Sequence, residues 1–445
     1  MNNVTRVLVI GQGGREHAIV RQIAQNSSIE SIYVVPGSDG MAGTPKVECL
    51  AMSTDASGFD GLVKFAKEKE IDLVVIGPEQ PLADGLADVV RAAGFKVFGP
   101  SKEGARLEAS KIHAKELMKA AGVRTARSFV VTSVAETITA AAAFKPPYVL
   151  KADGLAAGKG VFIEKTIDGL KTAARFLFEE KGLGVAGDSA LLEEFSPGVE
   201  LSHLVLTNGK GFISMPAARD HKRLLDDDEG PNTGGMGVVA PVPMVDGLLE
   251  QIERDVVAPV IREIEKRGFV FRGVLYFGLM LTPEGPSVLE FNTRFGDPEA
   301  QVLMTLLDEE AGPSWVEVLS DIADGKLPKT VWSTSRSVAC LVLAAEGYPD
   351  HPVKGVQISG LNSKGETDRL TTRGNETSYV IHAGTKRGAQ GGFVTNGGRV
   401  LNVVGYSDRG LQTALELAYS TAETITWSGR QIRRDIGRSV LDRKP

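Results

Sequence analysis

Short apolar segments alternate with helical stretches over the first hundred residues, and each segment ends in a turn that contains glycine or proline. The segments are RVLVIG (residues 6–11), SIYVVPG (31–37), DLVVIGPE (72–79) and FKVFGPS (95–101). Strands that alternate with helices in this way predict an open parallel α/β sheet. Such sheets bind ligands at loops beyond the carboxyl ends of their strands, so these four turns are candidate sites.

The chain is too long for one hydrophobic core, because 445 residues predict two to four domains. A second unit begins with a helical pattern at residues 102–121, followed by a hairpin-like pair of strands around a glycine-rich loop. A long polar loop at residues 220–237, an amphipathic helix at residues 248–267 and a β-hairpin come next. From about residue 333 we expect a small β-rich unit with a helix near residues 411–425.

Charge and cysteine content narrow the class of protein. The chain has 50 Lys and Arg against 56 Asp and Glu, a net charge of -6 that offers no global attraction for nucleic acid or an anionic membrane. Cys49 and Cys340 are too few and too far apart for a disulfide framework or a thiolate metal cluster, which fits a reducing cytoplasm. The apolar runs are shorter than the roughly 18 residues that span a bilayer. We therefore expect a cytoplasmic protein that acts on small molecules.

The segment KADGLAAGKG at residues 151–160 is the sharpest motif. Its glycines let backbone amides approach phosphate oxygens, and Lys151 and Lys159 supply positive charge at its two ends. It is not a Walker loop, because residues 154–159 are one residue too few and Gly160 stands where a magnesium-binding Ser or Thr is required. We interpret it as a flexible loop over the phosphates of ATP, with a purely structural glycine-rich hairpin as the alternative.

A carboxylate and an amide two positions apart indicate a metal site. Glu290 and Asn292 of VLEFN would share one face of a strand, whereas Leu289 and Phe291 would face apolar packing on the other. Oxygen ligands suit magnesium, which completes its coordination with water and phosphate oxygens. The loop TRFGDPE follows, and its Arg294 offers a fixed positive charge where charge develops during phosphoryl transfer.

Two further loops are candidates for anion binding. The turn GQGGRE after the first strand is a poor dinucleotide fingerprint, because Glu16 replaces the third glycine. It could instead hold a smaller anion on its backbone amides, with Arg15 and His17 nearby, or be a simple tight turn. The stretch DHKR at residues 220–223, with NTGGMG beyond it, has the composition of an adaptable lid or of a solvated charged loop. His221 in that stretch is either a base or a hydrogen-bond donor.

These motifs occur together, in order, in one family of ATP-grasp ligases. Over essentially its whole length the chain resembles the glycinamide ribonucleotide synthetases, through the segments VIGQGGREHA, VVPGSDG, VIGPEQPL, FGPS, KADGLAAGKGV, DHKR, GPNTGGMG, GLMLTPEG, EFNTRFGDPE, HAGTK and TNGGRVLNV. The resemblance implies an α/β protein with an N-terminal open parallel α/β domain at residues 1–105. It also implies a two-lobed ATP-grasp domain at residues 106–330, with a mobile lobe at about residues 125–195, and a small β-rich domain at residues 331–445.

The resemblance also implies a reaction, the second step of purine synthesis. ATP, glycine and 5-phosphoribosylamine would give glycinamide ribonucleotide, ADP and phosphate, with Mg²⁺ or Mn²⁺ as the cofactor. The glycine carboxylate would attack the γ-phosphate to form glycyl phosphate, and the amine would then displace phosphate, so that no side-chain nucleophile is needed. The family further implies a monomer with no nucleic-acid or membrane partner.

Roles carry over from the family position by position. The residues implied at ATP are Lys111, Lys151, Gly154, Gly158, Lys159, Gly160, the adenine-binding hinge Glu193, Glu194 and Phe195, and the ribose-binding Glu200. The implied metal ligands are Glu290 and Asn292. The residues implied in catalysis are Arg294, Asp220 and Lys222, and those implied at the glycine and phosphoribosylamine site are Gly13, Gly14, Glu79, Asn232, Gly234, Gly235 and Asp297.

Departures from the family pattern and rival functions complete the sequence interpretation. The strand GVLYFGLML lacks the additional metal-binding acid of many ATP-grasp enzymes, and His203 stands where an apolar residue is expected. One rival is another ATP-grasp carboxylate-amine ligase or carboxylase of purine metabolism. A second is a catalytically silent nucleotide-binding protein, which the presence of Lys151, Glu290 and Asn292 disfavours. An oxidoreductase is disfavoured by Glu16.

Overall fold

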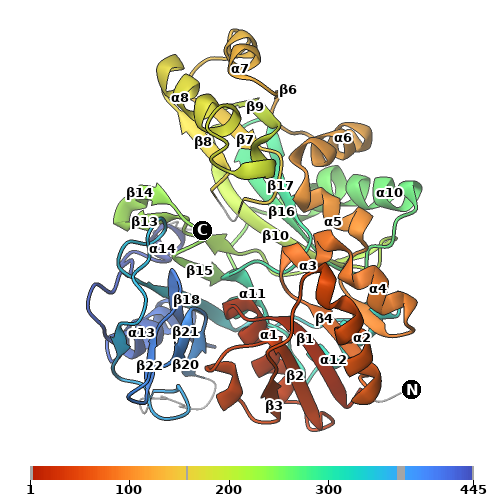
Figure 1. The fold of residues 1–445 in the computed structure, drawn as a ribbon, viewed down its shortest axis with the longest axis vertical. Coiled ribbons are helices and arrows are strands. Elements are labelled where there is room, and N and C mark those ends of the chain that lie inside the picture. The colour runs from red at the N-terminus through yellow and green to blue at the C-terminus, as the bar shows by residue number, and fades with distance from the viewer. Residues whose placement is uncertain (1–3, 157–158, 368–375, 443–445) are drawn as a thin grey trace.

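The computed structural model describes residues 4–156, 159–367 and 376–442 (Figure 1). A parallel N-terminal sheet lies at the lower right of the figure, a β-rich C-terminal region lies at the lower left, and a small lobe lies at the top. The long strands β10, β16 and β17 lie between these parts, at Val199–Thr207, Gly273–Thr282 and Gly285–Asn292. No helix within the described residues is long and apolar enough to cross a membrane. The predicted α/β fold class is confirmed.

The N-terminal sheet is parallel and has the strand order β3-β2-β1-β4-β5. Its strands are β1 (Arg6–Gly11), β2 (Ser31–Pro36), β3 (Val47–Cys49), β4 (Leu73–Ile76) and β5 (Lys96–Phe98). The intervening helices are α1 (Gly14–Ala24), α2 (Phe59–Glu68), α3 (Glu79–Asp84) and α4 (Leu86–Ala92), with short turns η1 (Met41–Gly43) and η2 (Ala56–Gly58). Side chains of β1 alternate between two cores, with Val7 and Val9 on one face and Leu8 and Ile10 on the other.

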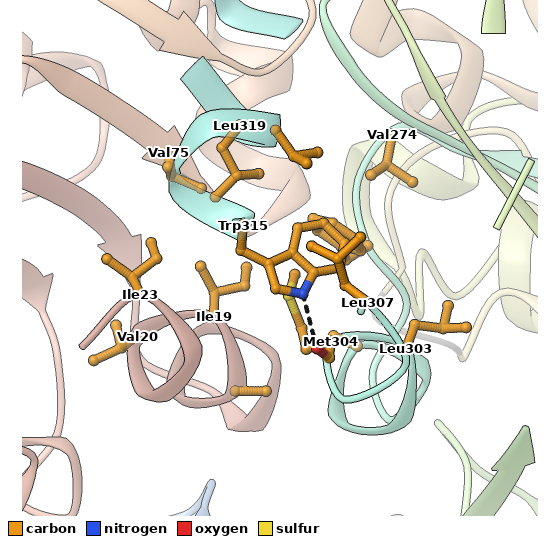
Figure 2. Close-up of a cluster of buried hydrophobic side chains, with 14 of the residues drawn as sticks. Ile19, Val20, Ile23, Val75, Val274, Leu303, Met304, Leu307, Trp315 and Leu319 are labelled. Carbon is orange, nitrogen blue, oxygen red and sulfur yellow. Dashed lines mark hydrogen bonds between the residues drawn. The ribbon is translucent and has the colours of Figure 1, made fainter. Parts of the chain in front are cut away.

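A helix from much later in the chain completes one face of this sheet. Helix α12 (Trp315–Ala323) packs beside α1 and β5, and Trp315 lies at the centre of the core that they share (Figure 2). The indole of Trp315 is 1% exposed, and its N–H donates to the Met304 carbonyl at 2.7 Å. A core that joins segments so distant in sequence fixes the N-terminal sheet against the central strands.

The central region contains two antiparallel sheets. The small lobe has the order β6-β9-β7-β8, at Ser128–Val131, Ala190–Glu194, Tyr148–Ala152 and Val161–Glu164, with helices α7 (Val134–Ala141) and α8 (Ile167–Phe178) and the turn η3 (Gly184–Gly187). The larger sheet has the order β11-β10-β16-β17, with β11 at Phe212–Ser214. Helices α5 (Lys102–Ala109), α6 (Lys111–Ala121), α9 (Leu248–Ile252), α10 (Ala258–Arg267) and α11 (Glu299–Leu303) accompany it.

The C-terminal region is built on a sheet of order β12-β15-β18-β23-β20, at Arg219–Asp220, Gly237–Ala240, Ser337–Ala344, Arg399–Ser407 and Thr377–His382. Helix α13 (Leu411–Ala422) covers it, followed by α14 (Arg438–Leu441). A second small sheet comprises β19 (Gln357–Ile358), β22 (Phe393–Thr395) and β21 (Thr385–Arg387). Strands β12 and β15 belong to this sheet although they precede residue 331, the predicted start of the third domain. The domain limits at residues 105 and 330 remain a proposal.

Two local predictions are wrong. The expected long loop at residues 220–237 contains strands β13 (Arg223–Leu225) and β14 (Glu229–Asn232), which pair as a hairpin through the turn η4 (Asp226–Asp228). The helical pattern of residues 102–121 is interrupted at Ser110, which adopts an extended conformation and caps α6 through the His113 amide. The predicted amphipathic helix is present as α9 and α10, joined by a π-helical turn (η5) at Glu253–Val257.

Two buried histidines join the first and last parts of the chain. The Nδ1 atom of His17 accepts from the His382 amide at 2.9 Å, and the two rings lie 5.8 Å apart. The ring of His382 also contacts the Thr385 hydroxyl and the Gly365 carbonyl. Burial lowers the pKa of His17 to about 3 and that of His382 to about 4.

Acidification is therefore expected to destabilise the protein through these two residues. Both imidazoles are neutral in the folded state, whereas in the unfolded chain they take up protons near pH 6.5. His382 alone contributes about 3 kcal/mol that is present above pH 6.5 and is lost as the pH falls towards 4. Denaturant midpoints at pH 7 and pH 4 should differ less for His382→Gln than for the wild type. The exposed His351→Gln serves as the control, and an unchanged difference in His382→Gln would contradict the prediction.

Candidate active site

An open cleft of about 390 Å³ lies where the small lobe, the central sheet and the N-terminal turns meet. Residues from every part of the chain line it, including most of the positions implied by the sequence. The predicted residues in the lining are Glu79, Lys111, Lys151, Gly154, Gly160, Glu193, Asp220, Lys222, Asn232, Gly234, Glu290, Asn292, Arg294 and Asp297. In the described residues, the lining contains no Ser, Cys or His, so the cleft holds no Ser–His or Cys–His pair for nucleophilic catalysis.

Two lysines of this cleft are anchored on one buried carboxylate. Lys151 of β7 and Lys115 of α6 form ion pairs with Glu193 of β9, at 2.7 and 2.9 Å. Burial alone would lower the pKa of Lys151, but the Glu193 and Glu290 carboxylates hold it above its usual value. The Lys151 ammonium is therefore charged and fixed at the root of the glycine-rich loop. The Glu193 side chain holds the lysines, while its backbone belongs to the predicted hinge.

Helix α6 brings a third lysine to the same end of the cleft. Because the helical segment is interrupted at Ser110, Lys111 is the first residue of α6. Its ammonium lies 3.5 Å from the Gly154 carbonyl. Asp153 secures the junction by accepting from the Ser110 hydroxyl and from the Ile112 amide. The interruption between α5 and α6, which the sequence pattern did not predict, thus places the Lys111 ammonium beside the glycine-rich loop.

A β-bulge in β17 corrects the prediction for Leu289. The pairing of β16 with β17 shifts at this point, where Gly278 faces Glu290 and Leu279 faces Val288. Leu289 consequently lies in the cleft lining instead of the apolar core, and its carbonyl accepts from the Lys151 ammonium at 3.2 Å. Apolar side chains from both lobes line this end of the cleft, namely Ala114, Met118, Val161, Leu191, Leu289 and Phe291. An apolar slot between two lobes suits a planar base.

The donor atoms of β17 fit a divalent cation in part. Glu290 faces the cleft, and its carboxylate has no hydrogen bond or ion pair with other residues that the structure describes. Burial alone would raise the pKa of Glu290, but Lys222 and Lys151 hold that pKa below its usual value. The Asn292 amide oxygen already accepts from Arg294 at 3.2 Å. No group of three or more potential acidic, His or Cys ligands exists within residues 4–156, 159–367 and 376–442, so phosphate and water would have to complete the coordination.

Arg294 joins the central sheet to the N-terminal sheet. Its guanidinium forms ion pairs with Glu108 of α5 at 2.7 Å and with Glu79 at 3.4 Å, beyond the carboxyl end of β4. Arg15 lies 3.8 Å from the same Glu79 carboxylate. Burial opposes ionisation of Glu79, but Arg294 and Arg15 lower its pKa to about 2. This corner of the cleft is a network of fixed charges contributed by three helices and the loop after β17.

A second charged group lies beneath the β13–β14 hairpin. Lys222 lies 3.6 Å from Glu200, and burial together with Glu299 raises the pKa of Asp220 well above its usual value. The Oδ1 atom of Asp220 has no hydrogen-bond partner in the part of the chain that the structure describes. Gly235 has a φ of 112°, and a Cβ atom there would lie 2.6 Å from that oxygen. Gly235 therefore makes room for Asp220 and does not itself line the cleft.

The C-terminal sheet contributes one residue that sequence reasoning missed. Arg399 of β23 forms an ion pair with Asp297 at 3.2 Å and donates to the Gly234 carbonyl at 2.7 Å. It also lines the cleft. Glu108, Lys115, Tyr276 and Glu299 are further lining residues that were not singled out. Arg399 lies within the quoted segment TNGGRVLNV, so that resemblance was the only available signal for it.

The other predicted site residues lie outside this lining. Gly13 and Gly14 are closely packed, since a Cβ atom would be 3.6 Å from the lining residue Asp297 and 2.5 Å from Asn402, respectively. Lys159 and Phe195 are exposed, and Glu194 pairs with Arg127 at the surface of the small lobe. Glu200 reaches the cleft only through Lys222. Gly158 lies outside the described residues.

Three histidines whose roles the sequence did not determine make contacts within the fold. His17 is paired with His382 and does not support an anion at the first turn, where the Gly13 amide already donates to Glu16. The two ring nitrogens of His221 contact the Gly237 carbonyl and the Gly437 amide, so it holds backbone together. His203 is fully buried against Phe277, and its Nε2 lies 3.4 Å from the Ser214 hydroxyl.

Comparison with known proteins shows to which family the chain belongs. The chain matches the N domain, the ATP-grasp (A) domain and the C domain of phosphoribosylglycinamide synthetase at residues 5–108, 109–300 and 338–439. The phosphoribosylamine–glycine ligases of Caldanaerobacter subterraneus and Nostoc sp. are 39% and 42% identical to it, over 97% and 98% of this chain and 99% of each relative. The crystal structure of phosphoribosylamine–glycine ligase from Thermotoga maritima superposes with a TM-score of 0.80 at 34% identity, covering 97% of this chain and 100% of that one. The chain therefore belongs to the phosphoribosylglycinamide synthetase family of ATP-grasp proteins.

Proposed function

We propose that this protein ligates glycine to 5-phosphoribosylamine at the expense of ATP, giving glycinamide ribonucleotide, ADP and phosphate in purine biosynthesis. One observation carries the proposal most directly. The cleft combines an apolar slot, four lysines and a free carboxylate at Glu290, but its described lining has no Ser, Cys or His nucleophile. Such a site is suited to phosphoryl transfer between bound substrates and not to covalent catalysis by a side chain.

The small lobe and the central sheet would each contact a part of the nucleotide. The apolar slot with Met118 and Leu289 would hold adenine, and the backbone of the Glu193 hinge would border it. Lys151 and Lys111 would contact the phosphates beneath the glycine-rich loop, since both line the cleft and the Lys111 ammonium lies 3.5 Å from the Gly154 carbonyl of that loop. Two fixed cations stabilise the charge on the transferring phosphoryl group without reorganisation of solvent.

Glu290 and Asn292 would hold a divalent cation, which we propose is Mg²⁺ or Mn²⁺. When bound, the cation would neutralise charge on the nucleotide phosphates. Asn292 would meet it with an oxygen already oriented by Arg294. Glu290 would remain ionised there, because its pKa lies below the usual value.

The remaining charges would position glycine and the amine. Arg294, Lys222 and Arg15 would hold the carboxylate of glycine and the phosphate of phosphoribosylamine, with Glu79 fixing both arginines. A carboxylate oxygen of glycine attacks the γ-phosphorus, and the bond to ADP breaks. The amine nitrogen then attacks the acyl carbon, and phosphate leaves with that oxygen. The unpartnered Oδ1 of Asp220 would accept a hydrogen bond from the attacking amine.

Substrate omission tests the proposal. With purified enzyme, ADP release should require glycine and freshly made phosphoribosylamine together, and leaving out either should reduce it to background. Equal ADP release without glycine, or with bicarbonate in its place, would instead indicate the rival ATP-grasp carboxylase. A protein that binds ATP but releases no ADP under any of these conditions would be the silent nucleotide-binding protein.

We also propose that the protein acts as a monomer in the cytoplasm. Both cysteines are free thiols, Cys340 in the core and Cys49 partly buried, which suits a reducing compartment. Sedimentation of the purified protein at assay concentration would reveal a dimer if the monomer proposal is wrong.

A further inference from the structure

The β13–β14 hairpin has little packing of its own, yet it carries cleft residues at its base. Lys222 directly precedes β13, and Asn232 ends β14. The base is closed by Thr233, whose amide and hydroxyl both donate to the Lys222 carbonyl, at 2.7 and 2.8 Å. Most of the hairpin is exposed, including Leu225 at 51%. Leu224 packs against a small buried apolar cluster, and otherwise the position of the hairpin depends on the residues that hold its outer turn.

That outer turn, Asp226–Asp228, has an unusual backbone. Asp227 and Asp228 both adopt positive φ angles, 56° and 55°. Consecutive left-handed residues other than glycine cost free energy and persist only where surrounding contacts determine them. The contacts in this case come from the other end of the chain.

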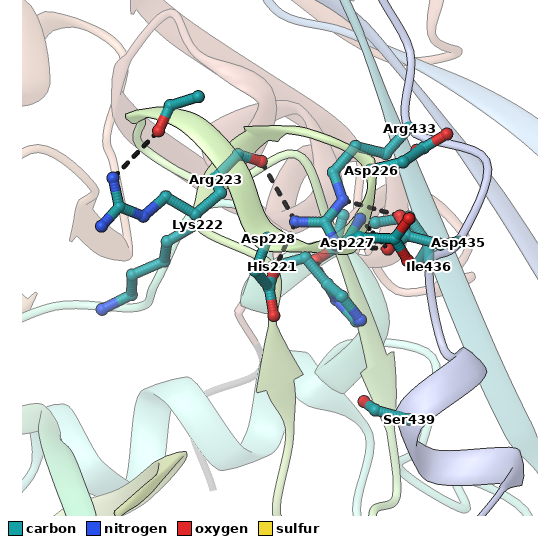
Figure 3. A network of polar contacts seen from close by, with 12 residues as sticks. His221, Lys222, Arg223, Asp226, Asp227, Asp228, Arg433, Asp435, Ile436 and Ser439 are labelled. Carbon is teal, nitrogen blue, oxygen red and sulfur yellow. Dashed lines mark hydrogen bonds and ion pairs between the residues drawn. The ribbon is translucent and has the colours of Figure 1, made fainter. Parts of the chain in front are cut away.

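A buried arginine in the C-terminal segment (residues 433–438) clamps the turn (Figure 3). The Arg433 side chain is 1% exposed and forms an ion pair with Asp228 at 2.8 Å. It also donates to the Arg223 carbonyl at 3.2 Å. Asp435 orients this guanidinium through two hydrogen bonds, at 2.8 and 2.7 Å. A bidentate pair of this kind fixes the plane of the guanidinium as well as its position.

Backbone contacts complete the clamp. The Asp227 amide donates to Asp435 at 2.9 Å, and Asp226 accepts from the Arg434 amide at 2.7 Å. His221, directly before Lys222, lies between the Gly237 carbonyl and the Gly437 amide. The C-terminal segment thus grips the hairpin at its turn and at its base, while the Lys222 side chain extends away from this cluster (Figure 3).

We propose that Arg433 is a positioning residue for the ligation, acting through the hairpin on Lys222. Its side chain is not among the residues that line the cleft. By clamping Asp228 and the Arg223 carbonyl, it holds β13 so that Lys222 stays within reach of Glu200 and the amine end of the site. Lys151 pairs with Glu193 and Lys111 contacts the Gly154 carbonyl, both outside this hairpin, so their alignment with ATP is expected to be independent of Arg433. This inference rests on the proposed function.

The substitution Arg433→Lys tests this proposal, because lysine keeps the positive charge but cannot make the two parallel hydrogen bonds of the guanidinium. We expect kcat/KM for glycine and phosphoribosylamine to fall by about 10-fold to 100-fold, with KM for ATP changed less than about twofold. Arg434→Ala is the matched control, since that neighbouring side chain is exposed and only its backbone amide joins the clamp. Asp228→Asn provides a second, milder variant in case the change at Arg433 impairs folding.

A double-mutant cycle separates positioning from general stability. In a Lys222→Gln background, Arg433→Lys should cause no further loss of kcat/KM, because its effect passes through Lys222. Independent losses that multiply, or kcat/KM values for glycine and phosphoribosylamine equal to wild type in both Arg433→Lys and Asp228→Asn, would overturn the inference. If wild-type enzyme showed no ligation of glycine at all, the proposed function would fail first, so the two failures are distinguishable.

Discussion

Replacing Lys151 with methionine is expected to lower kcat for ADP release by about 100-fold to 1,000-fold. The loss of one fixed positive charge aimed at the transferring phosphoryl group has effects of this size. The ammonium of Lys151 is buried, charged and held by Glu193 and the Leu289 carbonyl, so neither solvent nor a nearby flexible side chain can replace it. Steady-state ADP release with saturating glycine and phosphoribosylamine measures the change.

The control for this variant is Lys171→Met, an exposed lysine on α8 of the same lobe. It should keep wild-type kcat. Because Lys151→Met leaves Glu193 with only Lys115 as its ion-pair partner, folding must be verified by thermal unfolding before kcat is compared. A folded Lys151→Met enzyme with kcat within about threefold of wild type would show that this ammonium does not act on the phosphates.

Glu290→Gln is expected to lower kcat by about 100-fold and to raise the Mg²⁺ concentration that gives half-maximal activity. The substitution preserves the shape of the side chain but removes the ionised oxygens that face the cleft. Since Lys222 and Lys151 keep the pKa of Glu290 low, the carboxylate is available as an anionic ligand at neutral pH. A titration of activity with Mg²⁺ and with Mn²⁺ measures both effects.

Glu284→Gln supplies the matched comparison, because Glu284 lies exposed in the turn between β16 and β17 of the same hairpin. Its Mg²⁺ titration should coincide with that of the wild type. Should Glu290→Gln also give the wild-type titration and kcat, the assignment of this residue as a metal ligand is wrong.

The sequence predicted the parts of the fold that have strong local patterns. Four of the five strands of the N-terminal sheet are apolar runs with clear turns, and β16 and β17 form a long hairpin, so each of these was recognisable on its own. Strand β3 was missed, because it is only three residues long and has Glu48 at its centre. Strands β12 to β15 were missed because they are only two to four residues long. The apolar β15 pairs with the distant β18, a partner that its local sequence does not reveal. The break at Ser110 was missed because α5 and α6 share one helical pattern.

The sequence predicted the motif residues of the site but not the residues that are placed there by tertiary structure. Motif residues such as Lys151, Glu290 and Arg294 were found because their chemistry is compact in sequence, and the structure brings them into one cleft. The cleft position of Leu289 depends on a β-bulge, and the reach of Arg399 into the site depends on packing between distant sheets. Neither effect follows from spacing along the chain, because the bulge is set by how β17 pairs with β16 and the position of Arg399 by its contacts with the distant Gly234 and Asp297.

Transfer of oxygen from glycine to phosphate tests the central claim most directly. If the glycine carboxylate attacks ATP, the oxygen that bridges carbon and phosphorus leaves with phosphate when the amine attacks. With glycine labelled by oxygen-18 in both carboxylate positions, each phosphate released should therefore carry one labelled oxygen, and the glycinamide ribonucleotide formed should keep the other. Phosphate without label, formed together with ADP at the same rate, would contradict the account.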